Sequence, residues 1–127
     1  MQPILLKGTK TVMTTWNDAG PDVEVTFYFN DYRKTPMLSG KYRPIHQIKE
    51  DYLTSGIHRY YSRDFAYPND TVRGTITFLT PEFYPNCIWV GKKIRIQEGK
   101  HIVGYAIVEK IYNPILAGNP ISSWRSI

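Results

Sequence analysis

The sequence KIRIQEGKHIVGYAIVEKI, residues 93–111, contains the clearest fold signal in the chain. Ile94 and Ile96 alternate with polar residues on either side, the period-two pattern of a strand with one buried face. EGK, residues 98–100, is typical of a hairpin turn. HIVGYAIVEKIY, residues 101–112, is rich in Val, Ile and Tyr and contains a glycine, which favours a strand over a helix of the same length. This part of the chain therefore predicts an antiparallel hairpin.

The same reasoning extends to the rest of the chain. Period-two alternation recurs in VEVTFYF, residues 23–29, and in VRGTITF, residues 72–78, and a further short strand is expected over Cys87–Val90. Nine glycines and nine prolines punctuate the chain, and no amphipathic helix stands out. Many short strands separated by turn signals indicate an all-β domain, either a sandwich or a small closed barrel.

The chain length of 127 residues suits one domain. We expect the barrel to span residues 23–112. Residues 1–22 are interpreted as an N-terminal arm or an extra strand. Residues 113–127 are interpreted as an irregular tail, because Pro114 and Pro120 oppose regular structure there. Trp124 in that tail is expected either to pack on the barrel or to insert into a partner.

Charge and composition limit the chemical class of the partner and the cellular compartment only in part. The net charge of +5 permits attraction to RNA, to anionic lipid or to an acidic protein, without selecting among them. Cys87 is the single cysteine, so no internal disulfide can form; a buried, inert thiol in a reducing compartment is expected. No apolar run has the length of a signal-peptide core or a membrane helix, so a cytoplasmic location without a membrane is predicted.

The motifs for catalysis and cofactor binding are missing from the sequence. It contains neither GxxxxGK[ST] nor GxGxxG, and its three histidines lack metal-ligand spacing. We therefore expect no nucleotide, no metal, no cofactor and no enzymatic activity. One enzyme hypothesis rests on IHRYYSRDF, residues 57–65: a metal-free ribonuclease would use His58 as general base and nearby arginines for the phosphate. The alternative for this segment is a cationic loop with stacked tyrosines.

Two separated motifs are similar to one known family. RKTPMLSGKYRP, residues 33–44, resembles the signature near the start of the C-terminal domain of elongation factor Tu, and residues 72–111 resemble the closing strands of that domain. The resemblance implies a six-stranded antiparallel β-barrel. It also implies that the GTPase domain and the middle barrel of the factor have no counterpart here, so the chain is not a GTP-driven elongation factor.

The resemblance also implies a binding function. In the family this domain contacts the T stem of aminoacyl-tRNA, partly through a turn that matches Glu98 and Gly99, and it also contacts protein partners. The first hypothesis is a non-catalytic module that binds a protein or a tRNA-like RNA through a basic, tyrosine-rich surface. The residues assigned to that surface are Lys41, Tyr42, Arg43, Arg59, Tyr60, Arg63, Lys92, Lys93, Glu98 and Gly99, with Arg95 as a further candidate.

Other interpretations of the same residues stay open. An immunity or decoy protein could imitate this domain to block a toxin that acts on tRNA or on the translation machinery. Each candidate site residue also has a structural interpretation: the Thr-Pro and Arg-Pro pairs hold strand ends. Glu98 and Gly99 then form only a turn, and the lysines of residues 92–93 line a solvated strand edge that deters aggregation.

Overall fold

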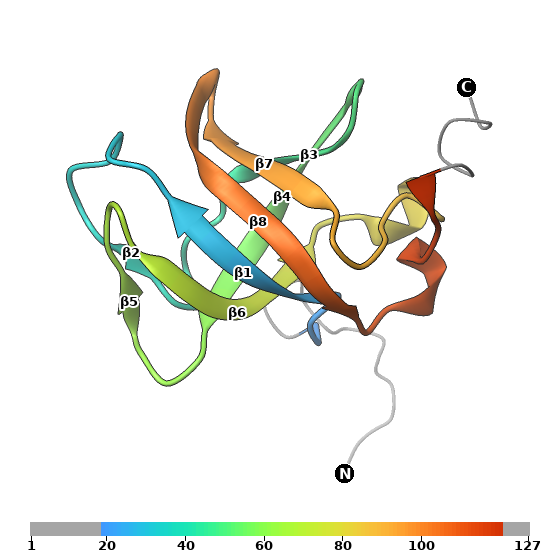
Figure 1. The fold of residues 1–127 in the computed structure, drawn as a ribbon, viewed down its shortest axis with the longest axis horizontal. Helices are drawn as coiled ribbons and strands as arrows, with labels where there is room; N and C mark the ends of the chain where they lie inside the picture. The colour runs from blue at the N-terminus through green and yellow to red at the C-terminus, as the bar shows by residue number, and fades with distance from the viewer. Residues whose placement is uncertain (1–18, 121–127) are drawn as a thin grey trace, which may run out of the picture.

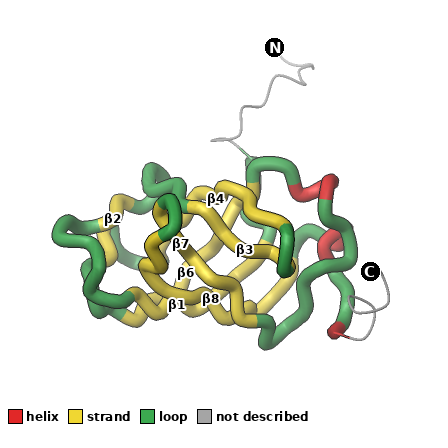
Figure 2. The backbone as a smooth tube through the Cα atoms, turned by 90° about the horizontal axis from the view of Figure 1, so that it is seen from above, coloured by secondary structure: helices red, strands yellow, loops and turns green. Residues whose placement is uncertain are grey.

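The computed structural model describes residues 19–120 and shows a closed six-stranded antiparallel barrel with the strand order β1-β6-β4-β3-β7-β8 (Figure 1). The predicted all-β barrel is thereby confirmed. A separate two-stranded sheet, β2-β5, lies at one end of the barrel, and two 3-10 turns lie at the other end (Figure 2). The elements are β1 Val23–Phe29, β2 Met37–Leu38, β3 Ile45–Lys49, β4 Tyr52–Tyr60, β5 Phe65–Ala66, β6 Thr71–Phe78, η2 Pro81–Phe83, β7 Lys93–Glu98, β8 His101–Ile111 and η3 Pro114–Leu116.

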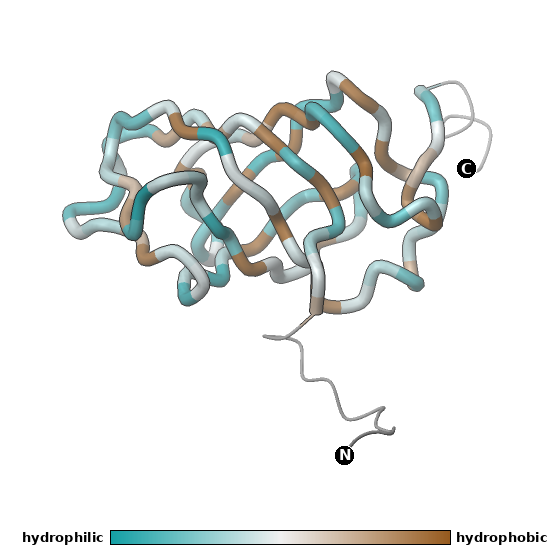
Figure 3. The backbone as a smooth tube through the Cα atoms, turned by 90° about the horizontal axis from the view of Figure 1, so that it is seen from below, coloured by the Kyte–Doolittle hydropathy of each residue, from teal (hydrophilic) through white to brown (hydrophobic). Residues whose placement is uncertain are grey.

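Strand β1 closes the barrel because it pairs along both edges. Phe27 lies opposite Val72 of β6 on one side and opposite Ala106 of β8 on the other. Alternate residues of β1 therefore point into one enclosed interior, where Val23, Val25 and Phe27 are fully buried. Hydrophobic and hydrophilic residues accordingly alternate along the strands (Figure 3). The period-two pattern that predicted the strands is the pattern of inside and outside.

Two strands of the barrel were not assigned from the sequence, nor were the two short strands β2 and β5. β3 and β4 form the hairpin whose turn contains Glu50 and Asp51, and β4 joins β3 to β6. Burial alternates poorly in β4, where Ile57 and His58 are adjacent and both fully buried. Burial alternates in β3, but that strand is only five residues long and one of its two buried positions is His46. A periodicity argument has little to detect where neighbouring residues on a strand are both covered.

The prediction of a strand over Cys87–Val90 was wrong. This segment makes only an isolated parallel bridge, between Ile88 and Ala117. Asn86 and Gly91 flank it with left-handed backbone, φ of 62° and 92°, and such conformations end an extended run. Cys87 itself is buried, as the sequence indicated.

Of the segment expected to form an irregular tail, residues 113–127, the structure describes residues 113–120. They contain η3, and the side chain of Leu116 is fully buried. Asp22 ties this segment to the barrel: its carboxylate accepts hydrogen bonds from the Phe78 amide at 2.7 Å and from Asn113 Nδ2 at 2.9 Å. The proposed arm is described only from residue 19 onward, and Trp124 lies outside the described residues. Among residues 19–120, no helix has the length and apolarity needed to cross a membrane.

We predict that replacing Gly74 destabilises the fold and that replacing Gly20 does not. A Cβ atom at Gly74 would clash with the backbone carbonyl of Arg59 on the neighbouring strand, whereas a Cβ at Gly20 would meet no atom within 4 Å. Gly74→Ala should therefore lower the free energy of unfolding by about 1–3 kcal/mol, and Gly20→Ala should leave it nearly unchanged. Urea denaturation of both variants measures the difference; equal stabilities would contradict this account of strand packing.

Candidate functional site

The residues predicted as a binding surface occupy four places on the fold rather than one. The turn after β2 carries Lys41, Tyr42 and Arg43; β4 and the loop after it carry Arg59, Tyr60 and Arg63; the start of β7 carries Lys92 and Lys93; and the β7–β8 turn carries Glu98 and Gly99.

Tyr42 and Glu98, both partly buried, are hydrogen-bonded to each other. The Tyr42 hydroxyl donates to Glu98 Oε2 at 2.5 Å, and Arg33 Nη1 donates to the same oxygen at 2.5 Å. The Arg33 guanidinium also lies 4.9 Å from the centroid of the Tyr42 ring. Burial, and then the hydrogen bond to Glu98, raise the pKa of Tyr42, so its phenol remains a proton donor. This cluster joins the two sequence motifs that carry the family resemblance, and it gives Tyr42 and Glu98 a structural role.

The structure corrects the prediction for Tyr60. Its side chain is only 6% exposed, and its ring packs edge-on against Phe27 and Phe29 at centroid distances of 5.5 and 6.2 Å. A ring enclosed in the barrel core cannot stack on a base that arrives from solvent. Tyr60 is therefore a core residue, because β4 turns it inward.

Arg63 and Arg59 are engaged in local hydrogen bonds. Arg63 Nη2 forms an ion pair with Asp70 at 2.7 Å, and its Nε donates to the Phe65 carbonyl at 2.8 Å. These contacts hold the loop between β4 and β6. Arg59 Nη1 donates to Thr77 Oγ1 on β6 at 3.2 Å. The predicted cationic loop thus uses at least two of its arginines to fix its own conformation.

The lysines that begin β7 each lie over an aromatic ring. The Lys92 ammonium is 4.0 Å from the centroid of Trp89, and the Lys93 ammonium is 4.1 Å from the centroid of Tyr105. Lys92 is partly buried, which lowers the pKa of its ammonium. Lys93 is exposed and presents its charge together with the ring beneath it.

A connected surface forms on the outer side of β7, β8 and β1. Tyr105 lies directly opposite Arg95 on one neighbouring strand and directly opposite Tyr28 on the other. Tyr28 is 47% exposed, and Lys93 lies two residues before Arg95 on the same side of β7. We call Tyr28, Lys93, Arg95 and Tyr105 the basic aromatic face. Its boundary toward the start of β1 is set by a carboxylate, that of Glu109, which accepts from Thr26 Oγ1 at 2.7 Å.

The sequence assigned only part of this face. Alternation placed Tyr28 on the outward side of its strand, but β1 and β8 are more than seventy residues apart in the chain, so their pairing was not visible. The strand that contains Tyr105 is apolar almost throughout, so alternation did not show on which side of the strand Tyr105 lies. The register of β8 between β7 and β1 brings the two rings and the two cations together.

Two histidines meet inside the barrel, which no sequence spacing indicated. The Nε2 atoms of His46 and His58 are 2.7 Å apart, and both side chains are fully buried. His46 Nδ1 lies 3.3 Å from the carbonyl oxygen of Thr54, which can only accept, so Nδ1 carries a hydrogen. His46 Nε2 is then the acceptor for His58 Nε2–H, and His58 Nδ1 is left to accept from the Tyr60 hydroxyl at 3.5 Å.

This network gives every ring nitrogen a hydrogen-bond partner while both imidazoles are neutral. Burial lowers the pKa of His46 to about 4, with the Thr54 carbonyl opposing that shift. Burial also lowers the pKa of His58 well below its ordinary value, and a charge on His46 would lower it further. A proton added to His46 Nε2 would place two N–H groups against each other at 2.7 Å, whereas a proton added to His58 Nδ1 would face the Tyr60 hydroxyl and leave a charge in the core.

The histidine pair also bears on the ribonuclease hypothesis. His58 is fully buried under Phe27 and Tyr42, with ring centroids 4.3 and 5.4 Å away, so no substrate in solvent reaches it as a general base. Within residues 19–120, no group of three or more His, Cys, Asp or Glu residues is arranged to hold a metal ion. The buried pair is therefore interpreted as part of the core.

Comparison with known proteins adds no assignment: the chain matches no protein-family model and no curated protein sequence.

We predict that Glu98 stabilises the barrel through Arg33 and Tyr42. Glu98→Ala removes the acceptor shared by both donors, whose side chains are partly buried, and should lower the free energy of unfolding by about 1–3 kcal/mol. Glu50→Ala, in the exposed β3–β4 turn, is the matched control and should change it by less than about 0.5 kcal/mol. If both variants unfold at the same urea concentration, the cluster has no structural role.

We also predict that acid destabilises the barrel through the histidine pair. Because the folded state lowers the pKa of His46 from 6.5 to about 4, the unfolded chain binds more protons between these values, and stability is lost as the pH falls through that window. The slope should approach about 1.4 kcal/mol per pH unit for each histidine.

Urea denaturation between pH 7 and pH 4 measures the slope. His46→Leu combined with His58→Leu should flatten it, whereas His101→Gln, on the exposed strand end, should not. A parent protein whose stability does not change in this range would contradict the neutral pair.

Proposed function

We propose that this protein is a non-catalytic module that binds RNA with unpaired bases on its basic aromatic face. The observation that carries the proposal is the cross-strand row of Arg95, Tyr105 and Tyr28, with Lys93 over the Tyr105 ring. Tyrosine rings on an open sheet surface stack on bases, and the flanking cations pair with phosphates.

The chemistry of the face favours RNA over a protein partner. Its two cations belong to β7, on one side of the central strand β8, and neither forms an ion pair with a carboxylate among the described residues. The fully buried centre of a protein interface is more apolar than the rest of the surface and is depleted in charged residues such as lysine. Here the centre consists of amphipathic rings and charges, an arrangement suited to a polyanion with flat bases.

The family resemblance supports the same assignment. The Glu98–Gly99 turn matches the element that contacts tRNA in the elongation factor Tu domain, and it lies at the end of β7, the strand that carries Lys93 and Arg95. Glu98 itself is held by Arg33 and Tyr42, so we assign it to positioning this turn rather than to RNA contact. Lys41 and Arg43, both exposed, lie in the turn after β2 and are not part of the proposed face.

The test is binding of a fluorescein-labelled oligouridylate and of an RNA stem–loop, measured by fluorescence anisotropy over a range of salt concentrations. The affinity for the oligouridylate should fall with salt, with a log–log slope of about −0.7 per neutralised phosphate. Tyr28→Ala should weaken binding by about 5- to 150-fold, because one stacked base contributes about 1–3 kcal/mol. Lys93→Ala should reduce the salt slope by about one phosphate contact.

Tyr67→Ala is the matched control, because Tyr67 is 50% exposed but lies beside the small β2-β5 sheet. It should bind RNA as the parent does. An affinity that is independent of salt, or an equal loss in the Tyr28 and Tyr67 variants, would contradict the proposed face. A blunt RNA duplex should bind more weakly than either probe, because its bases are not available for stacking.

A further inference from the structure

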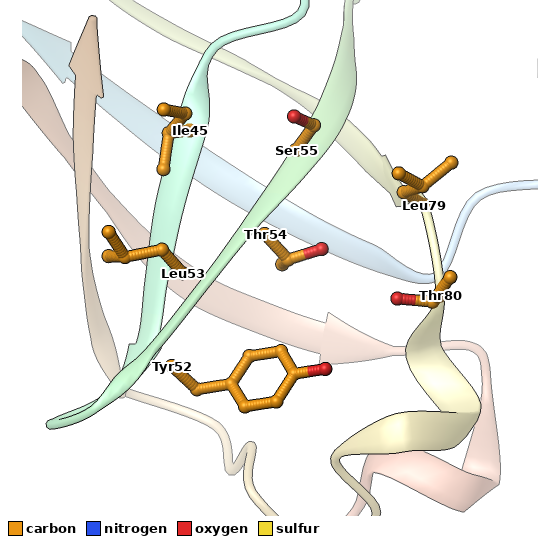
Figure 4. Close-up of a pocket in the computed structure, with 7 residues that line it drawn as sticks. All are labelled: Ile45, Tyr52, Leu53, Thr54, Ser55, Leu79 and Thr80. Carbon is orange, nitrogen blue, oxygen red and sulfur yellow. The ribbon is translucent and has the colours of Figure 1, made fainter. Parts of the chain in front are cut away.

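A groove of about 300 Å³ lies between β4 and the end of β6, away from the basic aromatic face (Figure 4). Leu53 and Leu79 stand at its edges and are 50% and 48% exposed. Figure 4 shows the Tyr52 ring at one end, with its hydroxyl directed toward the segment that carries Thr80. The residues that line the groove are Ile45, Tyr52, Leu53, Thr54, Ser55, Leu79 and Thr80.

The groove exists because the pairing between β4 and β6 stops before β4 does. Gly56 lies opposite Phe78, and the Leu79 amide donates to the Ser55 carbonyl at 3.0 Å. Continued in the same register, the ladder would place residue 81 opposite Leu53. Residue 81 is a proline, which has no N–H to donate, and the chain turns there into η2.

Strand β4 therefore keeps an open edge at Leu53. Backbone groups of alternate residues in an antiparallel strand point to alternate sides. Ser55 bonds toward β6, so the N–H and C=O of Leu53, two residues earlier, also point toward β6 and hence into the groove. Unpaired groups at a strand edge, next to exposed leucines, are the features that accept an added strand from another chain.

The charges around this edge favour a cationic occupant. Glu50 and Asp51 are exposed in the β3–β4 turn beside Tyr52, and Glu82 is exposed in η2 beside the groove. Lys49 supplies one ammonium against these three carboxylates. A segment that pairs with Leu53 would run between η2 and the β3–β4 turn, with an acidic group near each of its ends.

We propose that this groove binds an extended peptide of a partner protein, with alternating apolar residues and a lysine or arginine at each end, which adds a short strand to the open edge of β4. The site is separate from the RNA face, so it can bind its peptide whether or not the RNA proposal holds. The module would then connect an RNA to a basic protein segment.

The test uses the full chain, isotopically labelled, and the peptide acetyl-Lys-Val-Thr-Val-Lys-amide as probe. Titration should shift the amide resonances of Leu53, Ser55 and Leu79 and leave those of Tyr28 and Tyr105 in place. A probe N-methylated at its central residue should bind about 10-fold more weakly, because it loses a backbone hydrogen bond. The same loss is expected when glutamates replace both lysines of the probe.

Leu79→Asn should lower the affinity for the peptide by about 5- to 10-fold, because an apolar contact is lost. Leu38→Asn is its matched control, because Leu38 is 42% exposed on β2 and should leave peptide binding unchanged. Both leucines are exposed, so neither change should unfold the barrel, and unfolding measurements confirm this directly.

Three outcomes would overturn the proposal. The first is the absence of shifts along β4 at saturating probe. The second is equal binding of the N-methylated and unmodified probes, which would exclude strand addition. The third is the same shifts appearing with protein concentration alone, which would show a second copy of this chain in the groove instead of a partner peptide.

Discussion

The closure of the barrel by β1 is the constraint on which the rest of the structure depends. Because β1 pairs with β6 on one edge and β8 on the other, every strand of the barrel acquires an inner and an outer side. The inner side forces Tyr60 and the two buried histidines into the core. The outer side brings Tyr28 next to Tyr105. The hydrogen-bonded pairing of β4 with β6 cannot continue at Pro81, so one end of β4 keeps an open edge inside the closed sheet.

Two polar clusters, one inside the barrel and one at its rim, are hydrogen-bonded in different ways. In the histidine pair each ring nitrogen has one partner, either the other ring, the Thr54 carbonyl or the Tyr60 hydroxyl, and burial keeps both rings neutral. The Arg33–Glu98–Tyr42 cluster is charged and lies at the rim, where it connects the turn after β2 to the β7–β8 turn. Low dielectric makes an unpaired group costly in the core, whereas a charged cluster is tolerated where side chains keep some contact with water.

The fold class followed from the sequence more reliably than the site. Segments with clean alternation, such as residues 72–78, became strands, since half of each faces the core and half faces outward. The segment Cys87–Val90 is equally apolar, but it forms only a single β-bridge, because the residues on either side of it have left-handed backbone conformations. For binding residues the difficulty was the side of the strand: Tyr60 and Tyr28 are both tyrosines on strands, and only burial distinguishes the core residue from the exposed ring.

The sequence by itself determined an all-β chain, its main strands and the absence of a nucleotide-binding motif, because these depend on local periodicity and on contiguous residues. Only the tertiary structure decided which cations are held by their own molecule, which aromatic rings face outward side by side, and that His46 meets His58. Each of these depends on the register between strands distant in the chain. That register is fixed by closing one barrel around one core, a condition that no local stretch of sequence contains.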